Sequence, residues 1–154
     1  MNTTTVVRTE RVPRTGEYEQ LAHMASAGKL LLRVVIGALI LFHGVSKIKN
    51  GLGPIPGLLT QHGLPAELAY LCYAGEVVAP LMLIVGVWTR LAALIVVVNM
   101  ATAVALVHMP QILTVNEQGG WALELQAMYL FGALAVMLLG AGRYSAGGAL
   151  GRWN

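Results

Sequence analysis

Charged side chains are scarce in this sequence. Its 154 residues include 10 Lys and Arg and 7 acidic residues, all of them glutamate, so only 11% of the chain is charged while 56% is hydrophobic. Soluble domains carry about 25% charged residues. The shortage excludes an ordinary water-soluble domain of this size, and it predicts that lipid surrounds most of the surface.

Several chemical signatures are also missing. Cys72 is the only cysteine, which excludes an internal disulfide and a Cys-x-x-Cys redox pair. The sequence has no glycine-rich phosphate loop, no dense metal-ligand motif, no nucleophile elbow, and no signature of haem, flavin or iron–sulfur clusters. The net charge of +3 is not gathered in a dense patch, so no nucleic-acid partner is expected.

The chain instead contains four apolar stretches. Each is about 20 residues long, enough to cross the ~30 Å hydrocarbon core of a bilayer as an α-helix. The period-two alternation of a transmembrane β-strand is absent. The sequence therefore predicts an all-α integral membrane protein, a four-helix transmembrane bundle with spans at about 29–47, 66–88, 90–109 and 121–140.

The connections and the basic residues predict how the bundle is oriented. Residues 50–65 hold four glycines and three prolines, which is typical of a loop, and a short turn near Trp88–Arg90 joins the second and third spans. The positive-inside rule places both termini in the cytoplasm, with residues 1–28 and 141–154 as polar tails around the membrane domain 29–140. Lys47 and Lys49 then lie on the outer side, and eight basic residues lie inside: Arg8, Arg11, Arg14, Lys29, Arg33, Arg90, Arg143 and Arg152.

Glu76 is the most informative polar residue within the predicted spans. It lies ten positions after Ala66, about 15 Å deep by helical rise and so close to the midplane. A lone ionised carboxylate is very unfavourable there, so Glu76 must be paired, hydrogen-bonded or protonated. Pro80 cannot donate to the Glu76 carbonyl, which predicts a kink beside the carboxyl group. Two interpretations stay open: a structural glutamate that links helices, or a functional acid.

Other ionisable residues are predicted near the outer end of the bundle. His43 and Lys47 are four residues apart and share one helix face. His43 is either a satisfied core histidine or a ligand or proton-handling group, and Glu124 is either an interfacial carboxylate or a partner of Lys47 or His43. We expect the four candidate catalytic residues to converge on a pocket in the outer half of the bundle: Glu76, His43, Lys47 and Glu124.

Three further polar residues have simpler interpretations. Arg33 either snorkels to the cytoplasmic headgroups or contacts another span, and Asn99 is expected to form an interhelical hydrogen bond. His108 lies nine residues beyond Asn99, on the opposite side of a regular helix, and its side chain is expected to contact water near the outer surface. Two histidines and two glutamates on the spans could hold a metal, but their spacing does not require one, so no metal site is predicted.

From about Leu30 to Tyr144 the chain resembles the DoxX family of small bacterial membrane proteins. The resemblance depends on the first span, with Arg33, Gly37, His43, Gly44 and Lys47; on Gly63–Pro65; on the second span, with Glu76, Gly86 and Arg90; on Glu124; and on the segment Gly140–Ser145. The family usually has Gly-Pro-Gly in that last segment and often an Asp soon after. This chain has Ala141 there and no Asp, so its C-terminal tail is less typical.

The resemblance implies a four-helix membrane protein and points to oxidoreductase systems linked to quinones or thiols, with soluble redox enzymes as partners and a quinone as the candidate cofactor. A quinone would need an apolar slot and a proton donor such as His43, Lys47 or protonated Glu76. The alternative is a non-catalytic membrane anchor or a small-solute carrier in the plasma membrane. Gly37 and Gly44, small residues on one face, could support a homo-oligomer.

Overall fold

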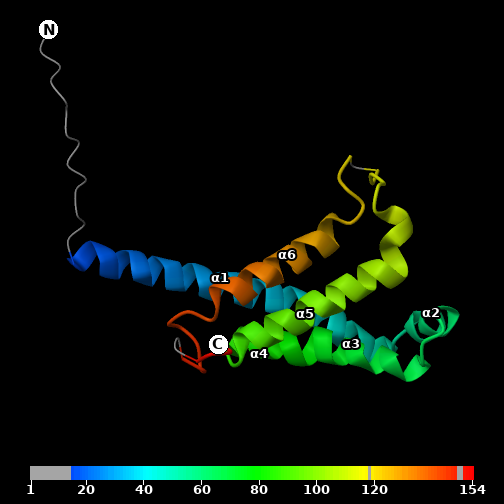
Figure 1. The fold of residues 1–154 in the computed structure, drawn as a ribbon, viewed down its shortest axis with the longest axis horizontal. Helices are drawn as coiled ribbons and strands as arrows, with labels where there is room; N and C mark the ends of the chain where they lie inside the picture. Colours follow the sequence, from blue (N-terminus) through cyan, green and yellow to red (C-terminus); the bar gives the residue numbers. More distant parts are fainter. Residues whose placement is uncertain (1–14, 118, 149–150) are drawn as a thin grey trace, which may run out of the picture.

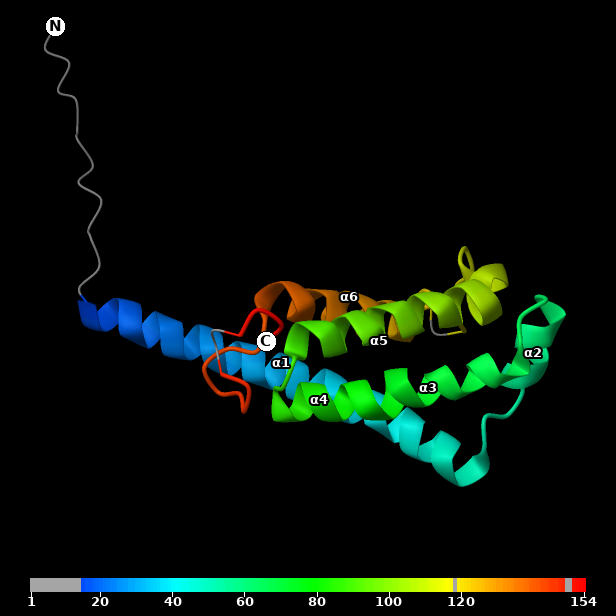
Figure 2. The same cartoon turned by 60° about the horizontal axis from the view of Figure 1, so that its bottom comes forward.

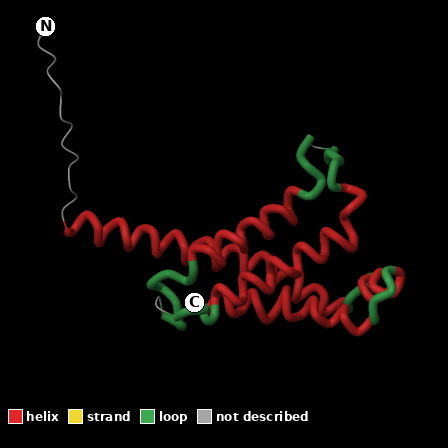
Figure 3. The backbone as a smooth tube through the Cα atoms, in the orientation of Figure 1, coloured by secondary structure: helices red, strands yellow, loops and turns green. Residues whose placement is uncertain are grey.

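The computed structural model describes residues 15–117, 119–148 and 151–154. The described chain is helical in each predicted span, and loops join the helices at the two ends of the bundle (Figure 3). Three helices are long and apolar enough to cross a membrane, and the helix near residue 130 is a shorter apolar one. This arrangement is consistent with the predicted all-α four-helix membrane bundle.

The first helix, α1 (Thr15–Asn50), is a single rod of 36 residues. At 1.5 Å per residue it is about 54 Å long, far longer than the predicted span at 29–47. Its N-terminal part projects beyond the rest of the bundle (Figure 1). Residues 15–28 of the predicted polar tail are thus helical, whereas the rest of that tail lies outside the described residues.

The second span is built from four consecutive pieces. They are a 3-10 turn η1 (Ala66–Tyr70), α3 (Leu71–Tyr73), a π turn η2 (Ala74–Val78) and α4 (Ala79–Val85). The π turn ends two residues before Pro80, where the sequence predicts a break in the regular helix. A short helix, α2 (Ile55–Gln61), also occurs within the segment that was predicted to be entirely loop.

The third span has a similar irregularity, and the fourth is short. The third consists of α5 (Thr89–Ala103), a π turn η3 (Val104–His108) and a 3-10 turn η4 (Met109–Gln111). The fourth is α6 (Glu124–Leu139), of 16 residues, three residues shorter at its start than predicted. The connection between α4 and α5 is the predicted tight turn, in which Gly86 adopts a φ of 78° and Trp88 one of 46°.

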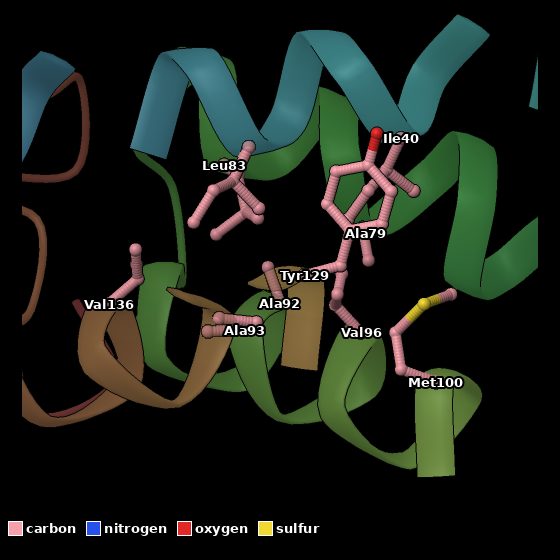
Figure 4. Packing of buried hydrophobic residues seen from close by; sticks show 11 residues of the cluster. Ile40, Ala79, Leu83, Ala92, Ala93, Val96, Met100, Tyr129 and Val136 are labelled. Carbon is pink, nitrogen blue, oxygen red and sulfur yellow. The ribbon is translucent and has the colours of Figure 1, made fainter. Parts of the chain in front are cut away.

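The four spans pack with α4 and α6 each against both α1 and α5 (Figure 2). Small side chains bring the helices close together, because Ala79, Ala92, Ala93 and Ala133 are all fully buried. Larger side chains from all four spans fill the remaining core, where the Tyr129 hydroxyl points towards Ile40 (Figure 4). Close helix packing through small residues is the usual way in which membrane helices associate.

Two glycines of α1 serve this packing. A Cβ atom on Gly44 would overlap the backbone carbonyl of Glu76, and one on Gly37 would lie 2.9 Å from the carbonyl oxygen of Pro80. Both positions therefore face the second span of the same chain. The prediction that they form a contact between copies is wrong.

Arg33 joins three segments at the opposite end of the bundle. Its guanidinium is buried, 1% exposed, and donates to the carbonyl oxygens of Leu83 at 2.6 Å, Ile84 at 2.7 Å and Tyr144. It thus satisfies carbonyls at the end of α4 that lack helical partners and suits the negative end of the helix dipole. Contact with another span is confirmed, and snorkelling is wrong.

The C-terminal segment folds back onto the same end. The amides of Ala146 and Gly147 donate to the carbonyls of Val85 and Gly86, at 3.2 and 2.9 Å. The Asn154 side chain accepts hydrogen bonds from the Thr89 amide and hydroxyl, at 3.2 and 2.9 Å. This segment therefore covers the turn between α4 and α5.

We predict that Gly44→Ala destabilises the bundle. The added methyl group meets backbone rather than a movable side chain, and overpacking of this kind costs about 1–3 kcal/mol. Thermal unfolding in detergent, followed by loss of the monodisperse peak, measures the effect. Gly28→Ala is the matched control, because Gly28 lies on the same helix with nothing within 4 Å of its added Cβ. Equal melting temperatures for the two variants would contradict the proposed contact.

We also predict that Arg33→Lys lowers the free energy of unfolding by about 3 kcal/mol, because one ammonium cannot reach all three carbonyls and a hydrogen bond to a charged group contributes about 1.5–3 kcal/mol. The same melting experiment tests this prediction. Arg143→Lys, at an exposed arginine on the same end of the bundle, should leave the melting temperature unchanged. A similar loss in both variants would show that the three carbonyl contacts are not what Arg33 contributes.

Candidate functional site

An ion pair between two helices lies at the centre of the candidate site. Lys47 Nζ of α1 donates to Glu76 Oε1 of η2. The Glu76 side chain is 8% exposed and that of Lys47 27%, so the carboxylate is nearly enclosed and the ammonium is partly covered. Tyr73 supports the same contact by donating its hydroxyl to the Lys47 carbonyl at 3.2 Å. A carboxylate in apolar surroundings needs such a partner.

The second span positions Glu76 through its π turn. A π turn contains more residues than an α turn, and it commonly marks a functional site. Gly44 admits the Glu76 backbone against α1, and Gly75 admits the side chain of Asn99 from α5. The interhelical contact of Asn99 is therefore real. Its predicted hydrogen bond is wrong for the described part of the chain, where Asn99 packs against Gly75 instead.

A cavity of about 160 Å³ adjoins this ion pair. We call it the polar cavity. Apolar side chains such as Ile40 and Met100 line part of it. The rest of its lining is polar and comes from all four spans: His43, Lys47, Glu76, His108, Gln126 and Tyr129.

The structure brings three of the four predicted site residues together. Lys47, Glu76 and His43 line the polar cavity, whereas Glu124 does not. Glu124 is exposed at the first turn of α6, where a negative charge suits the helix dipole. Its predicted pairing with Lys47 is wrong, because Lys47 binds Glu76. The catalytic roles of these residues stay predictions.

His43 differs from the buried histidine that the sequence suggested. It is exposed rather than enclosed, and its ring meets the edge of Tyr129 at a centroid distance of 6.0 Å and an angle of 78°. No hydrogen bond from its ring to another described residue is present. Both ring nitrogens therefore remain available to a ligand in the polar cavity.

His108 belongs to the site, although the sequence predicted only that its side chain contacts water. The turn η3 ends at His108, two residues before Pro110, just as η2 ends two residues before Pro80. His108 lies within this wider turn, so its direction differs from that in a regular helix, and its side chain lines the cavity. Pro110 is the signal in the sequence that could have indicated this irregularity.

The hydrogen bonds of His108 fix the orientation of Gln126. His108 Nδ1 lies 3.0 Å from Gln111 Oε1, which can only accept, so Nδ1 carries the proton and Nε2 accepts. Gln126 Nε2, at 3.5 Å from His108 Nε2, is then the donor. Sequence reasoning missed Gln126, although its amide is an unusual polar group within the fourth span.

Two buried oxygens at the cavity lack a donor. Within the described residues, Glu76 Oε2 and Gln126 Oε1 are buried and make no hydrogen bond. Buried polar atoms are nearly always satisfied, and both of these belong to residues that line the polar cavity. The site is therefore suited to a ligand that presents two hydrogen-bond donors.

The geometry supports a hydrogen-bonding ligand better than it supports a metal ion. Among the described residues, no group of three or more His, Cys, Asp or Glu lies close enough to hold a metal ion. Cys72 is free and partly buried one helical turn before Glu76. Its thiol does not line the polar cavity.

Comparison with known proteins covers the part of the chain that holds most of these residues. A family model described as DoxX matches residues 28–109, a range that contains Arg33, the Lys47–Glu76 pair and His108. A Bacillus subtilis (strain 168) protein named "Putative oxidoreductase CatD" is 28% identical over 103 residues, which are 67% of this chain and 76% of that protein. No solved structure matches the chain.

We predict that Lys47→Met destabilises the protein by about 3 kcal/mol, because it leaves the enclosed carboxylate without its cation; removing one partner of a buried pair costs about 3–5 kcal/mol. The low end applies because Lys47 is partly exposed. The double variant Lys47→Met/Glu76→Gln should recover most of the loss, since no charge is then left unpaired. A double variant no more stable than Lys47→Met, measured by melting in detergent, would refute the role of the ion pair.

Proposed function

Because this chain belongs to the DoxX family, whose model matches more than half of it, we propose that it is the membrane subunit of a quinone-linked oxidoreductase system. The proposed site is the polar cavity, which binds the ring of the reduced quinone. The name of the Bacillus subtilis relative supports oxidoreductase chemistry. The apolar spans support a membrane location, and the proposed membrane is the bacterial plasma membrane.

The single observation that carries this proposal is the pair of unsatisfied acceptors, Glu76 Oε2 and Gln126 Oε1. A hydroquinone presents two O–H donors, whereas the oxidised quinone presents only carbonyl acceptors. The reduced ring therefore suits the cavity better. Its size fits as well, because a cavity of about 150 Å³ admits one benzene ring and the polar cavity has about 160 Å³.

The residues around the cavity suggest how a quinone is reduced there. Two electrons come from a soluble redox enzyme, because this chain carries no signature of its own redox group. Two protons must reach the carbonyl oxygens to form the hydroxyls. His43 lines the cavity and can donate protons that are replaced from the outer side, while Lys47 stays paired with Glu76. Glu76 and Gln126 then accept hydrogen bonds from the two new hydroxyls, which stabilises the reduced product.

A non-catalytic anchor is the second candidate, and one observation favours it. The N-terminal part of α1 extends beyond the bundle and exposes Tyr18, Leu21 and Met24, at 53, 58 and 64%. Such a projecting helix can hold a soluble enzyme at the membrane. An anchor would retain its partner when Glu76 is changed, whereas quinone-linked activity would not survive that change.

We predict that purified protein in lipid nanodiscs binds a tail-free hydroquinone more tightly than the matching quinone. Glu76→Gln should weaken hydroquinone binding by about tenfold or more, since a hydrogen bond to a charged group contributes about 1.5–3 kcal/mol. Gln126→Leu is a second variant, which leaves the ion pair intact and should show a smaller loss. Calorimetric titration measures both.

The matched control for this experiment is Glu124→Gln, which removes an exposed carboxylate outside the cavity. Its affinity for hydroquinone should equal that of the unchanged protein. Equal binding of quinone and hydroquinone, or equal losses in Glu76→Gln and Glu124→Gln, would count against the proposed site. Variants are compared only where their melting temperatures show that they are folded at the temperature of titration.

A further inference from the structure

We propose that a second cavity in the outer half of the bundle holds the aliphatic tail of the same quinone whose ring lies in the polar cavity. This inference rests on the proposed function and adds the class of substrate, a lipid-soluble quinone that carries a chain. The second cavity has a volume of about 320 Å³ and lies between the end of α5 and α6. We call it the apolar cavity.

Gln126 lies between the two cavities. Its side chain lines both of them, and its neighbours on α6 divide between the two. Leu125 and Tyr129 line the polar cavity, whereas Ala127 and Leu130 line the apolar one. In the proposed arrangement the polar ring lies in the polar cavity, the apolar chain lies in the apolar cavity, and the Gln126 amide lies at the point where the chain meets the ring.

The apolar cavity opens towards lipid rather than water. Its lining includes Ala101, Ala105 and Phe131, whose side chains are exposed on α5, η3 and α6. Trp121 closes the outer end, where its indole donates to the Ile112 carbonyl at 2.8 Å. A tryptophan at a span end lies at headgroup level, so the opening below it faces acyl chains. A hydrophobic ligand can enter sideways from the bilayer.

The acyl chain of an ordinary lipid is a poorer occupant. It carries no donor for Gln126 Oε1, which is buried and unsatisfied among the described residues. A chain-bearing hydroquinone supplies that donor. This difference favours the quinone over a phospholipid as the occupant of the polar and apolar cavities.

The apolar cavity contributes space for the tail of the ligand rather than a gain in hydrophobic binding free energy. Lipid is as apolar as the cavity wall, so moving a tail from bilayer to cavity gains little free energy. Its contribution is instead to leave room for the tail while the ring reaches Glu76 and Gln126. A bulky side chain in the apolar cavity should therefore exclude a tail-bearing ring and leave binding of a tail-free ring unchanged.

The test uses the full chain in nanodiscs and two probes, a tail-free hydroquinone and the same ring with a decyl tail. Ala105→Phe narrows the apolar cavity from its rim, and Ala101→Phe is a second variant if the first fails to fold. We expect the dissociation constant of the decyl probe to rise by about tenfold or more, because the fixed ring can no longer be placed without a clash. The dissociation constant of the tail-free probe should not change.

Val98→Phe is the matched control. Val98 is 56% exposed on α5 and lines neither cavity, so this variant should bind both probes as the unchanged chain does. Equal affinities of Ala105→Phe and Val98→Phe for the decyl probe would overturn the placement of the tail. The same holds if Ala105→Phe changes only the lipids that co-purify, because the apolar cavity would then be a lipid site. If the unchanged chain binds neither probe, the proposed function fails and the tail placement fails with it.

Discussion

The arrangement of this bundle depends on the carboxylate of Glu76, which needs a charged partner. Glu76 sits in a span with little water around it, where an unpaired charge is far too costly. Lys47 meets that requirement from α1, and the contact is possible only because Gly44 lets the two backbones touch. Pairing leaves one carboxylate oxygen unsatisfied. The same charge that holds α1 to the second span therefore also creates an acceptor for a ligand.

Much of the fold could be predicted from hydrophobicity alone. The apolar runs are long, and the bilayer sets the length of a span, so the four spans and the tight turn near Trp88 follow from composition. The helical extent of α1 did not follow, because residues 15–28 lack the long apolar run that marks a span. The role of Arg33 was equally hidden, since its acceptors are backbone carbonyls that no side-chain pattern indicates.

The candidate site was predicted only in part, for a geometric reason. His43 and Lys47 were placed from the shared face of a regular helix, and Glu76 was placed with them from its predicted depth. His108 was missed because reasoning from a constant turn of about 100° per residue fails across a π turn. Gln126 lies on the regular helix α6, where its uncharged amide gave a weaker signal than the ionisable groups. Both π turns precede a proline by two residues. A proline within a membrane span is thus a reason to doubt the helical face of the residues just before it.

α1 is fastened to the second span at two separate points. Arg33 donates hydrogen bonds to carbonyls at the end of α4. Lys47, fourteen positions later and about 21 Å away along a continuous helix, pairs with Glu76 of η2. A piston-like shift of α1 past its neighbour would have to break both attachments together. A motion that keeps both attachments leaves α1 in place against the second span. α1 and the second span should therefore move as one rigid pair.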